Sequence, residues 1–538
     1  MLWADAVFIG GSITTLDDAN PNATAMAVRD GRVLFVGNDR ETIKYAGEGT
    51  VYVNLHGKHV VPGFCDAHLH VFWFGSLLAK QADLTCAAGV DELLTRLSDT
   101  AGKTDGWLLG RGFDQDKLAE RRFPTRQDLD RVSATRPILI TRVCGHAAVA
   151  NSATLAFLTD DERGLGDAAT GLYTETAIGA IRKYVPPMSD AESEQAVAAA
   201  LNVALSRGFT SVGTLLDTPE QMGAYQRLKR KGKLPPIRVT AHPPHKAAVG
   251  SLAENGIATG FGDEWLRYGG AKLFSDGSLG ARTALLAAPY ADDPAHPDNL
   301  GIRIYDPEDL KTKALDAQRK GWQLVIHAIG DQAVRETLDA IEYALDNDEG
   351  NRPNSYHRHR VEHASILPPD LLERMARRGI LGVLQPQFVT SDTWTGERVG
   401  AVRGAYAYPF KSMHDAGIPL ALSSDCPVET MDPFACLAAA VFRDPWSPDE
   451  RLTMAEALRL YCLGGAYAAH SEHERGSLTE GKFADFVILS GDLLTCATAD
   501  AVMALAVEQV FVGGEPAFSL ARASLPPTPS LIGMREGE

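Results

Sequence analysis

The sequence predicts an α/β fold: a (β/α)8 TIM barrel with a discontinuous β-sandwich and an insertion after the first barrel strand. Strand-like apolar runs alternate with helical patterns through the middle of the chain, as a parallel barrel requires. Several of these runs end in His, Lys or Asp, and the ends of separate strands meet at the C-terminal face of such a barrel. Two further sets of short apolar runs with glycine turns lie near the two ends of the chain.

The composition is that of an ordinary globular enzyme. The 538 residues are enough for two or three domains, and 45% are hydrophobic and 22% charged. A net charge of -17 argues against a nucleic-acid or anionic-membrane partner, so we expect a small-molecule substrate and leave a homodimer open. The first residues lack the pattern of a signal peptide and no apolar run could cross a bilayer, which favours a cytoplasmic protein.

The two ends of the chain predict one shared β-sandwich. Residues 1–60 carry apolar runs at 6–9, 25–28 and 33–36, each followed by a glycine turn, which indicates a small antiparallel unit. Residues 476–520 repeat this pattern. Either set alone would expose an apolar face, so we expect the two to pack together. The tail after about Ala517, which we delimit as 521–538, is rich in Pro, Ser and Leu and is expected to be poorly ordered.

The barrel is assigned to residues 61–475. Residues 331–345 show one apolar stripe at helical spacing, as expected of a helix covering the barrel. A long stretch at about 83–200, with its own strands near 107–109 and 137–140, is interpreted as an insertion above the active-site mouth. The eight barrel strands are expected near 61–68, 210–215, 237–242, 270–274, 323–327, 360–363, 382–386 and 420–425.

The first barrel strand ends in a His-x-His pair. His68 and His70 lie two residues apart, so on a strand they share one face and can converge on a metal ion. The pair alone is weak support, since polar residues often end strands. The later strands strengthen the interpretation because they also end in potential ligands or partners: Lys272, His327, His363 and Asp425.

These motifs resemble the amidohydrolase superfamily of metal-dependent hydrolases, in the type-3 branch that includes N-substituted formamide deformylases. The resemblance covers nearly the whole chain and rests on VVPGFCDAHLH, RGFDQ, GHAAVANSATL, AKLFSDGSLGARTA, VIHAIGDQA, RVEHA, LALSSDCPV and GSLTEGKFADFVIL, in this order. It implies a barrel flanked by a β-sandwich, with a site for one or two metal ions at the barrel mouth.

The resemblance also implies a complete ligand set. Imidazoles and carboxylates suit Zn²⁺, whereas a lysine ammonium cannot bind a metal. Lys272 becomes a ligand only as an N6-carboxylated carbamate, and the alternative is a lysine paired with Asp276 or Glu175. The alternative for the histidines of the later strands is a structural role in the core. The implied ligands are His68, His70, Lys272, His327, His363 and Asp425.

Asp425 is the candidate catalytic residue. It could accept a proton from metal-bound water and deliver it to the departing nitrogen, as general base and then general acid. The alternative is a helix N-cap, since Pro427 follows it closely. Four more residues are candidate substrate-binding residues: Glu175 and His146, with a solvated or structural role as the alternative, and Asp276 and Arg282, with a loop-stabilising salt bridge as the alternative.

The favoured function is hydrolysis of a non-peptide C–N bond in an amide, formamide or related compound. An esterase or lactonase could use the same chemistry, and a deaminase would use one metal ion. A non-catalytic binding protein should have lost ligands, yet all six positions are filled. Aromatic residues in expected loops at 72–74 and 393–395 suggest an apolar portion of the substrate.

Overall fold

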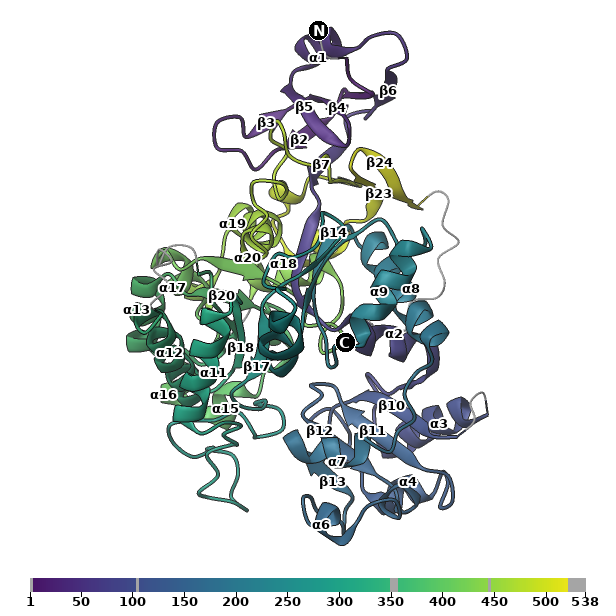
Figure 1. The fold of residues 1–538 in the computed structure, drawn as a ribbon, viewed down its shortest axis with the longest axis vertical. Helices are drawn as coiled ribbons and strands as arrows, with labels where there is room; N and C mark the ends of the chain where they lie inside the picture. Colours follow the sequence, from purple (N-terminus) through teal and green to yellow (C-terminus); the bar gives the residue numbers. More distant parts are fainter. Residues whose placement is uncertain (1–2, 103–105, 349–356, 444–446, 521–538) are drawn as a thin grey trace.

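The structure is a computed structural model, and it describes residues 3–102, 106–348, 357–443 and 447–520. Parallel strands form its centre in two arcs, one of four and one of five strands, and helices cover their outer sides (Figure 1). The first arc has the order β16 (Leu266–Tyr268), β15 (Arg238–His242), β14 (Phe209–Leu215), β8 (Phe64–Leu69), and the second runs β17 (Ala271–Phe274), β18 (Leu324–Ala328), β19 (Arg360–His363), β20 (Leu381–Leu384), β21 (Leu420–Leu422).

Backbone hydrogen bonds join the two arcs at two places. At one of them the amide of Lys272, on β17, donates to the carbonyl of Pro243, directly after β15, at 2.9 Å. At the other, the amide of Asp425 donates to His68 at 2.9 Å and the amide of His70 donates to Cys426 at 2.8 Å. Each of the eight strand positions expected from the sequence holds a parallel strand, and β16 is an additional short strand beside β15.

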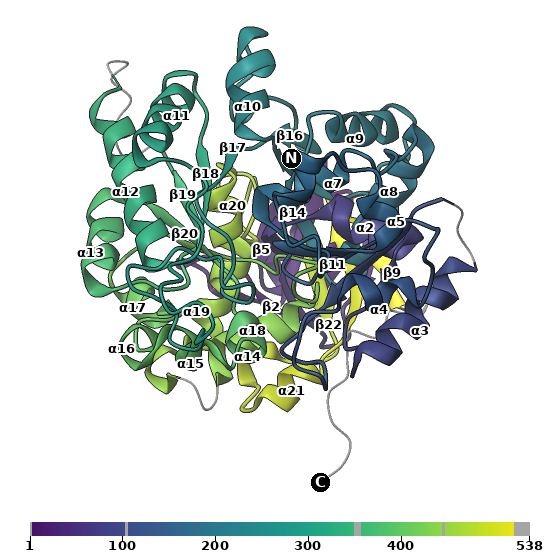
Figure 2. The same ribbon diagram turned by 90° about the horizontal axis from the view of Figure 1, so that it is seen from below.

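The helices bury apolar stripes against these strands. The stripe expected at 331–345 is confirmed as α12 (Asp331–Asp346), which buries Ala333, Val334, Leu338 and Ile341. Figure 2 shows α11 (Pro307–Arg319), α12 and α13 (Pro369–Arg378) along the outside of β18, β19 and β20. On the other side α8 (Asp190–Ser206) packs along α2 (Val71–Lys80). Gly75 allows this approach, because a Cβ there would lie 2.2 Å from the carbonyl oxygen of Ala196.

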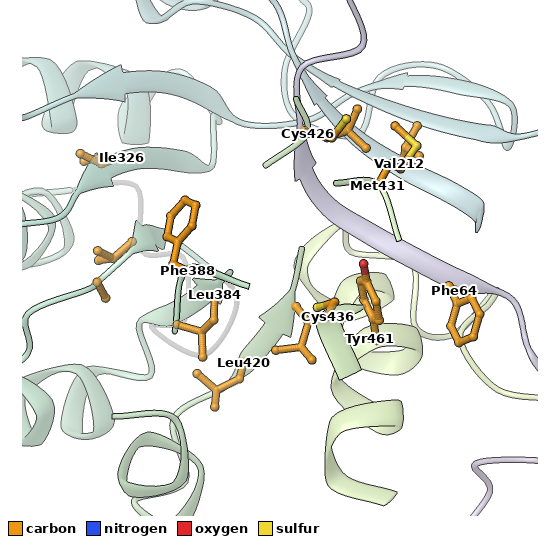
Figure 3. Packing of buried hydrophobic residues seen from close by; sticks show 14 of the residues in the cluster. Phe64, Val212, Ile326, Leu384, Phe388, Leu420, Cys426, Met431, Cys436 and Tyr461 are labelled. Atoms are coloured by element: carbon orange, nitrogen blue, oxygen red, sulfur yellow. The ribbon is translucent and has the colours of Figure 1, made fainter. Parts of the chain in front are cut away.

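One apolar core runs through the two arcs of parallel strands and the surrounding helices. Phe64 of β8 contacts the ring of Phe434 at a centroid distance of 6.4 Å and that of Tyr461 at 5.9 Å. Figure 3 shows Phe64 and Tyr461 on one side of this core and Leu384 and Leu420 on the other. Because these side chains are fully or almost fully buried, the strands that carry the polar site residues stand on a close-packed base.

Strands from both ends of the chain share one sheet. β22 (Phe486–Leu489) pairs with β7 (His59–Pro62) in a six-stranded sheet, and a second sheet of four strands faces it. Phe8 contacts Phe486 and Phe511 edge-on at 5.0 and 5.3 Å, so the two sheets pack face to face. The other strands of the pair are β1 (Ala6–Ile9), β2 (Ser12–Thr14), β3 (Asn22–Ala23), β4 (Ala25–Arg29), β5 (Arg32–Gly37), β6 (Val51–Asn54), β23 (Val507–Val512) and β24 (Glu515–Ser519).

Two details of this region differ from expectation. The N-terminal unit is not wholly antiparallel, because β1 pairs with β6 and β2 pairs with β7 in parallel. The last strand, β24, continues to Ser519, past the position where disorder was expected to begin. The tail at 521–538 lies outside the described residues.

The expected insertion forms a five-stranded mixed sheet (Figure 1). Its strands are β9 (Ala82–Asp83), β10 (Leu108–Phe113), β11 (Ile138–Arg142), β12 (Ala147–Ala150) and β13 (Leu172–Thr174). The last residues of the expected range 83–200 do not belong to this sheet. They form the start of α8, which begins at Asp190 and packs on α2 beside the parallel strands. Among the described residues, no helix has the length and apolarity needed to span a membrane.

Candidate active site

Three histidines and one aspartate converge at the ends of the parallel strands. Nε2 of His68 and Nε2 of His70 each lie 3.4 Å from Oδ1 of Asp425. One potential ligand atom from each of His68, His363 and Asp425 lies within 4.8 Å of the others. All four side chains are buried. The strand-end residues of β8, β19 and β21 therefore meet in one cluster.

The backbone at this cluster is locally unusual. His363 and Asp425 have φ values of 75° and 56°, the left-handed region that residues other than glycine seldom occupy. Such conformations are retained where the surrounding structure enforces them, often at functional sites. The alternative role of Asp425 as a helix cap is wrong, because the next helix, α18 (Pro433–Phe442), is capped by Asp432.

Hydrogen bonds fix the rings of three of the histidines. Nδ1 of His68 contacts the carboxylate of Glu362, and Nδ1 of His363 lies 2.7 Å from Oε1 of Gln385. Nε2 of His327 lies 2.9 Å from the carbonyl oxygen of Gly277. A ring whose one nitrogen is held in this way presents the other nitrogen in a set direction, as metal-binding histidines do.

Glu362 and Gln385 did not emerge from the sequence. Glu362 is fully buried and also accepts hydrogen bonds from Arg360 at 2.6 and 2.7 Å. The sequence did contain one signal for Glu362. Arg360 and Glu362 are alternate residues of a buried strand, so they share a face, and a buried ion pair is costly enough to indicate a specific role. Gln385 follows β20 directly and gave no comparable signal.

The protonation states favour a divalent cation. Burial lowers the pKa of His70 to about 4 and that of His363 to about 3, and it holds the pKa of His327 well below its usual range. Burial alone would raise the pKa of Asp425, but the attraction of His68 and His70, whose Nε2 atoms lie 3.4 Å from Oδ1, outweighs it and the net pKa is well below the ordinary value. Neutral imidazoles beside an ionised carboxylate are a donor set that suits Zn²⁺ and similar ions.

Lys272 is buried among these groups without a hydrogen-bond partner for its Nζ atom in the described part of the chain. Burial lowers the pKa of its amine to about 8, and Nζ lies 4.5 Å from the ring centroid of Phe274. The expected alternative, a pair with Asp276 or Glu175, is not formed: Asp276 instead accepts the backbone N–H groups of Leu285, Ile329 and Gly330, and Glu175 contacts His146.

The four candidate substrate-binding residues lie in two different surroundings. Nδ1 of His146 lies 2.7 Å from a carboxylate oxygen of Glu175, and the His146 ring is 5.1 Å from that of His327. Burial lowers the pKa of His146, but the charge of Glu175 outweighs it and raises the pKa to about 9. Arg282 forms a salt bridge with Asp292 at 2.8 Å, and Asp276 is fully enclosed by backbone donors.

Comparison with known proteins assigns the family. The model described as "Amidohydrolase family" matches residues 51–518. The chain belongs to the amidohydrolase family. It is 34% identical to YtcJ of Bacillus subtilis over 90% of this chain and 94% of that protein. It is 29% identical to N-substituted formamide deformylase of Arthrobacter pascens over 95% of this chain and 97% of that protein. The crystal structure of an uncharacterized metal-dependent hydrolase from Pyrococcus furiosus shares 33% identity with a TM-score of 0.75, over 91% of this chain and all of that one.

Two residues of the cluster, His363 and Asp425, line a cavity of about 150 Å³. His327, His363 and Asp425 form one wall, and the insertion supplies the facing residues, among them Asp114, Arg142, Cys144 and His146. Residues from the segment that holds the five-stranded sheet therefore line the same cavity as His363 and Asp425. The aromatic residues of this cavity are Phe388 and Tyr408.

The aromatic segments chosen from the sequence are placed differently. Residues 72–74 are not a loop but part of α2, where Phe72 and Phe74 are buried in the core. Trp394 lies against Arg398, whose guanidinium carbon is 3.8 Å from its ring centroid. His70 and Lys272 line a second cavity of about 810 Å³ together with Asp217, His245 and Phe274.

Proposed function

We propose that this amidohydrolase hydrolyses a non-peptide C–N bond in an amide, formamide or related compound. The observation that carries the proposal is the buried Asp425 carboxylate, which lies 3.4 Å from Nε2 of both His68 and His70 and lines the cavity. A relative aligned over nearly its full length carries the name N-substituted formamide deformylase, which supports this class of substrate. We further propose that the two arcs of parallel strands form one (β/α)8 barrel at 61–475, between the sandwich segments 1–60 and 476–520.

The proposed metal site holds one or two zinc ions. The donor set fits the ion, because it contains the carboxylate of Asp425 and the neutral imidazoles of His70, His327 and His363. In addition, Oδ1 of Asp425 is buried without a hydrogen-bond partner among the described residues. A bound divalent ion supplies a hydroxide nucleophile at neutral pH by lowering the pKa of water. The proposed ligands are His68, His70, Lys272, His327, His363 and Asp425.

Asp425 would move the proton of the reaction. As an ionised carboxylate at the cavity wall it can accept the proton that the attacking water loses, and then donate it to the nitrogen of the departing amine. His146 faces the same cavity in its charged form and is held by Glu175, so we propose that this pair contacts the substrate carbonyl or its substituent. Asp276 and Arg282 would act indirectly, by holding the loop that provides Ser278 and Gly280 to the cavity.

Lys272 would enter the site after reaction with CO2. Its neutral amine can attack CO2 to form a carbamate, with loss of one proton, and the carbamate oxygens would then make Lys272 a metal ligand. A pKa of about 8 favours this reaction, because a larger fraction of the amine is neutral at physiological pH than for an exposed lysine. Because Nζ has no hydrogen-bond partner among the residues that the structure describes, that nitrogen is free to react.

The test is a comparison of matched substrates with the zinc-loaded enzyme. The panel contains formamides, N-acyl amines and cyclic imides, each with an ester or lactone of the same shape, and an aminated heterocycle. We expect turnover of one C–N class, its loss on chelation and its return with zinc. Preference for the esters would make the protein an esterase or lactonase, and release of ammonia from the heterocycle would make it a deaminase. Full activity in protein shown to contain no metal would refute the mechanism.

A further inference from the structure

His70 is oriented differently from the other histidines of the proposed metal site. His68, His327 and His363 each have a hydrogen-bond partner on one ring nitrogen. Nδ1 of His70 has none among the described residues, although this atom is shielded from solvent. Its Nε2 points to Asp425, so some other contact must hold the ring in that direction.

That contact is the indole of Trp73. The two rings are stacked with centroids 3.7 Å apart and an interplanar angle of 4°. The geometry follows from the sequence: His70 is the N-cap of α2 and Trp73 is three residues further on, so both side chains project from the same side of the first turn. Stacking resists tilting of the imidazole away from its orientation parallel to the indole. A hydrogen bond on Nδ1 would otherwise restrain the same motion.

Trp73 is itself held from two other elements. Its indole N–H donates to Oδ2 of Asp217, after β14, at 2.7 Å. The guanidinium carbon of Arg111, on β10 of the insertion, lies 4.3 Å from the ring centroid. Arg111 is buried, and in a dry environment a cation against an indole is held more strongly than at a surface. Gly145 completes the enclosure, since a Cβ there would lie 3.0 Å from the Trp73 ring.

We propose that Trp73 is a positioning residue that orients His70 by ring stacking, and that Arg111 and Asp217 fix Trp73 for this task. The inference rests on the proposed role of His70 as a metal ligand. The proposal gives the insertion a role in forming the metal site, because its strand β10 carries Arg111, which contacts the Trp73 ring.

The experiment measures metal affinity directly. Purified metal-free protein is titrated with Zn²⁺ in competition with a chromophoric chelator, and the visible spectrum of the Co²⁺-loaded protein reports ligand geometry. Loss of a residue that orients a ligand typically weakens metal affinity 10- to 100-fold. We expect Trp73→Leu to show a loss of this size and a changed Co²⁺ spectrum, and Trp73→Phe, which keeps a ring for stacking, to lie closer to the wild type. Unchanged affinity and spectrum in Trp73→Leu would overturn the proposal.

A second pair of variants covers the case in which Trp73→Leu does not fold. Asp217 is exposed, so changes there leave the core intact. Asp217→Ala removes the acceptor of the indole N–H, whereas Asp217→Asn keeps an oxygen and removes only the charge. We expect a weaker metal affinity in the alanine variant than in the asparagine variant. Equal affinities, both like the wild type, would count against the proposal.

Two controls separate its failure from that of the proposed function. Trp265 also carries an arginine on its ring, with the Arg238 carbon at 4.6 Å from the centroid, but it precedes β16 at the other end of the strands. Trp265→Leu should leave metal affinity and spectrum unchanged. His70→Ala should lose metal. If it does not, His70 is not a ligand and the proposed site fails, whereas a loss in His70→Ala with no effect of Trp73→Leu refutes the positioning role alone.

Discussion

Replacing Glu362 by glutamine should destabilise the fold and weaken metal binding together. The Glu362 carboxylate is fully buried and accepts two hydrogen bonds from the buried guanidinium of Arg360, at 2.6 and 2.7 Å, beside its contact with Nδ1 of His68. Glutamine keeps the shape and removes the charge, which leaves Arg360 uncompensated. Breaking a buried ion pair in this way costs about 3–5 kcal/mol. The lost orientation of His68 should lower metal affinity by about 10- to 100-fold.

Urea unfolding of the metal-free protein isolates the first effect, and chelator competition measures the second. The matched control is Glu336→Gln, because Glu336 also forms a bidentate pair, with Arg303 at 2.7 to 3.2 Å, but that arginine side chain is 45% exposed. A pair of this kind contributes about 0–1 kcal/mol. If Glu362→Gln unfolds at the wild-type urea concentration, or destabilises no more than Glu336→Gln, the buried pair is not what supports His68.

Three further outcomes follow from the site. Asp425→Asn should keep the fold and much of the metal but lose about 10²- to 10⁴-fold in kcat, with a smaller change in KM; near-normal turnover would remove the proton-transfer role. Lys272→Ala should lose metal equivalents in elemental analysis, and short carboxylic acids with bicarbonate should partly restore them; full occupancy without additives would exclude a carbamate ligand. Glu175 raises the pKa of His146 from 6.5 to about 9, so the charged imidazole stabilises the metal-free fold fully below pH 6.5, and this contribution is lost as pH rises through about 9. Glu175→Gln should abolish that pH dependence of the unfolding free energy in urea. An unchanged pH profile would show that the pair is not coupled.

The strands and their terminal residues could be read from the sequence because both depend on local pattern. An apolar run that ends in a polar residue marks where a buried strand reaches the barrel mouth, and parallel strands bring such ends together. This is why His68, His363 and Asp425, far apart in the chain, were chosen together and lie together in the structure. The helix α12 was equally visible, since its apolar stripe has the helical period.

Contacts between elements could not be read in the same way. Gln385 orients His363 from a neighbouring strand, and nothing near Gln385 in the sequence marks it as a partner. The parallel pairing of β1 with β6 likewise joins segments whose local patterns fit either direction. Residues 72–74 were expected in a loop because aromatic residues follow the histidines, yet the chain enters α2 directly after His70 and two of the three rings turn into the core.

The sheet shared by both ends of the chain sets the order in which the protein can be completed during synthesis. β7 ends at Pro62 and β8, which carries His68, begins at Phe64, so the two strands are almost one continuous ribbon. One edge of β7 pairs with β2, which is made before it, but the other edge pairs with β22, at 486–489, which leaves the ribosome only after nearly all of the chain. At about 5–20 residues per second this delay is on the order of tens of seconds. We therefore expect one edge of β7 to stay unpaired in the nascent chain until β22 is made, and metal to bind the finished protein rather than the growing one.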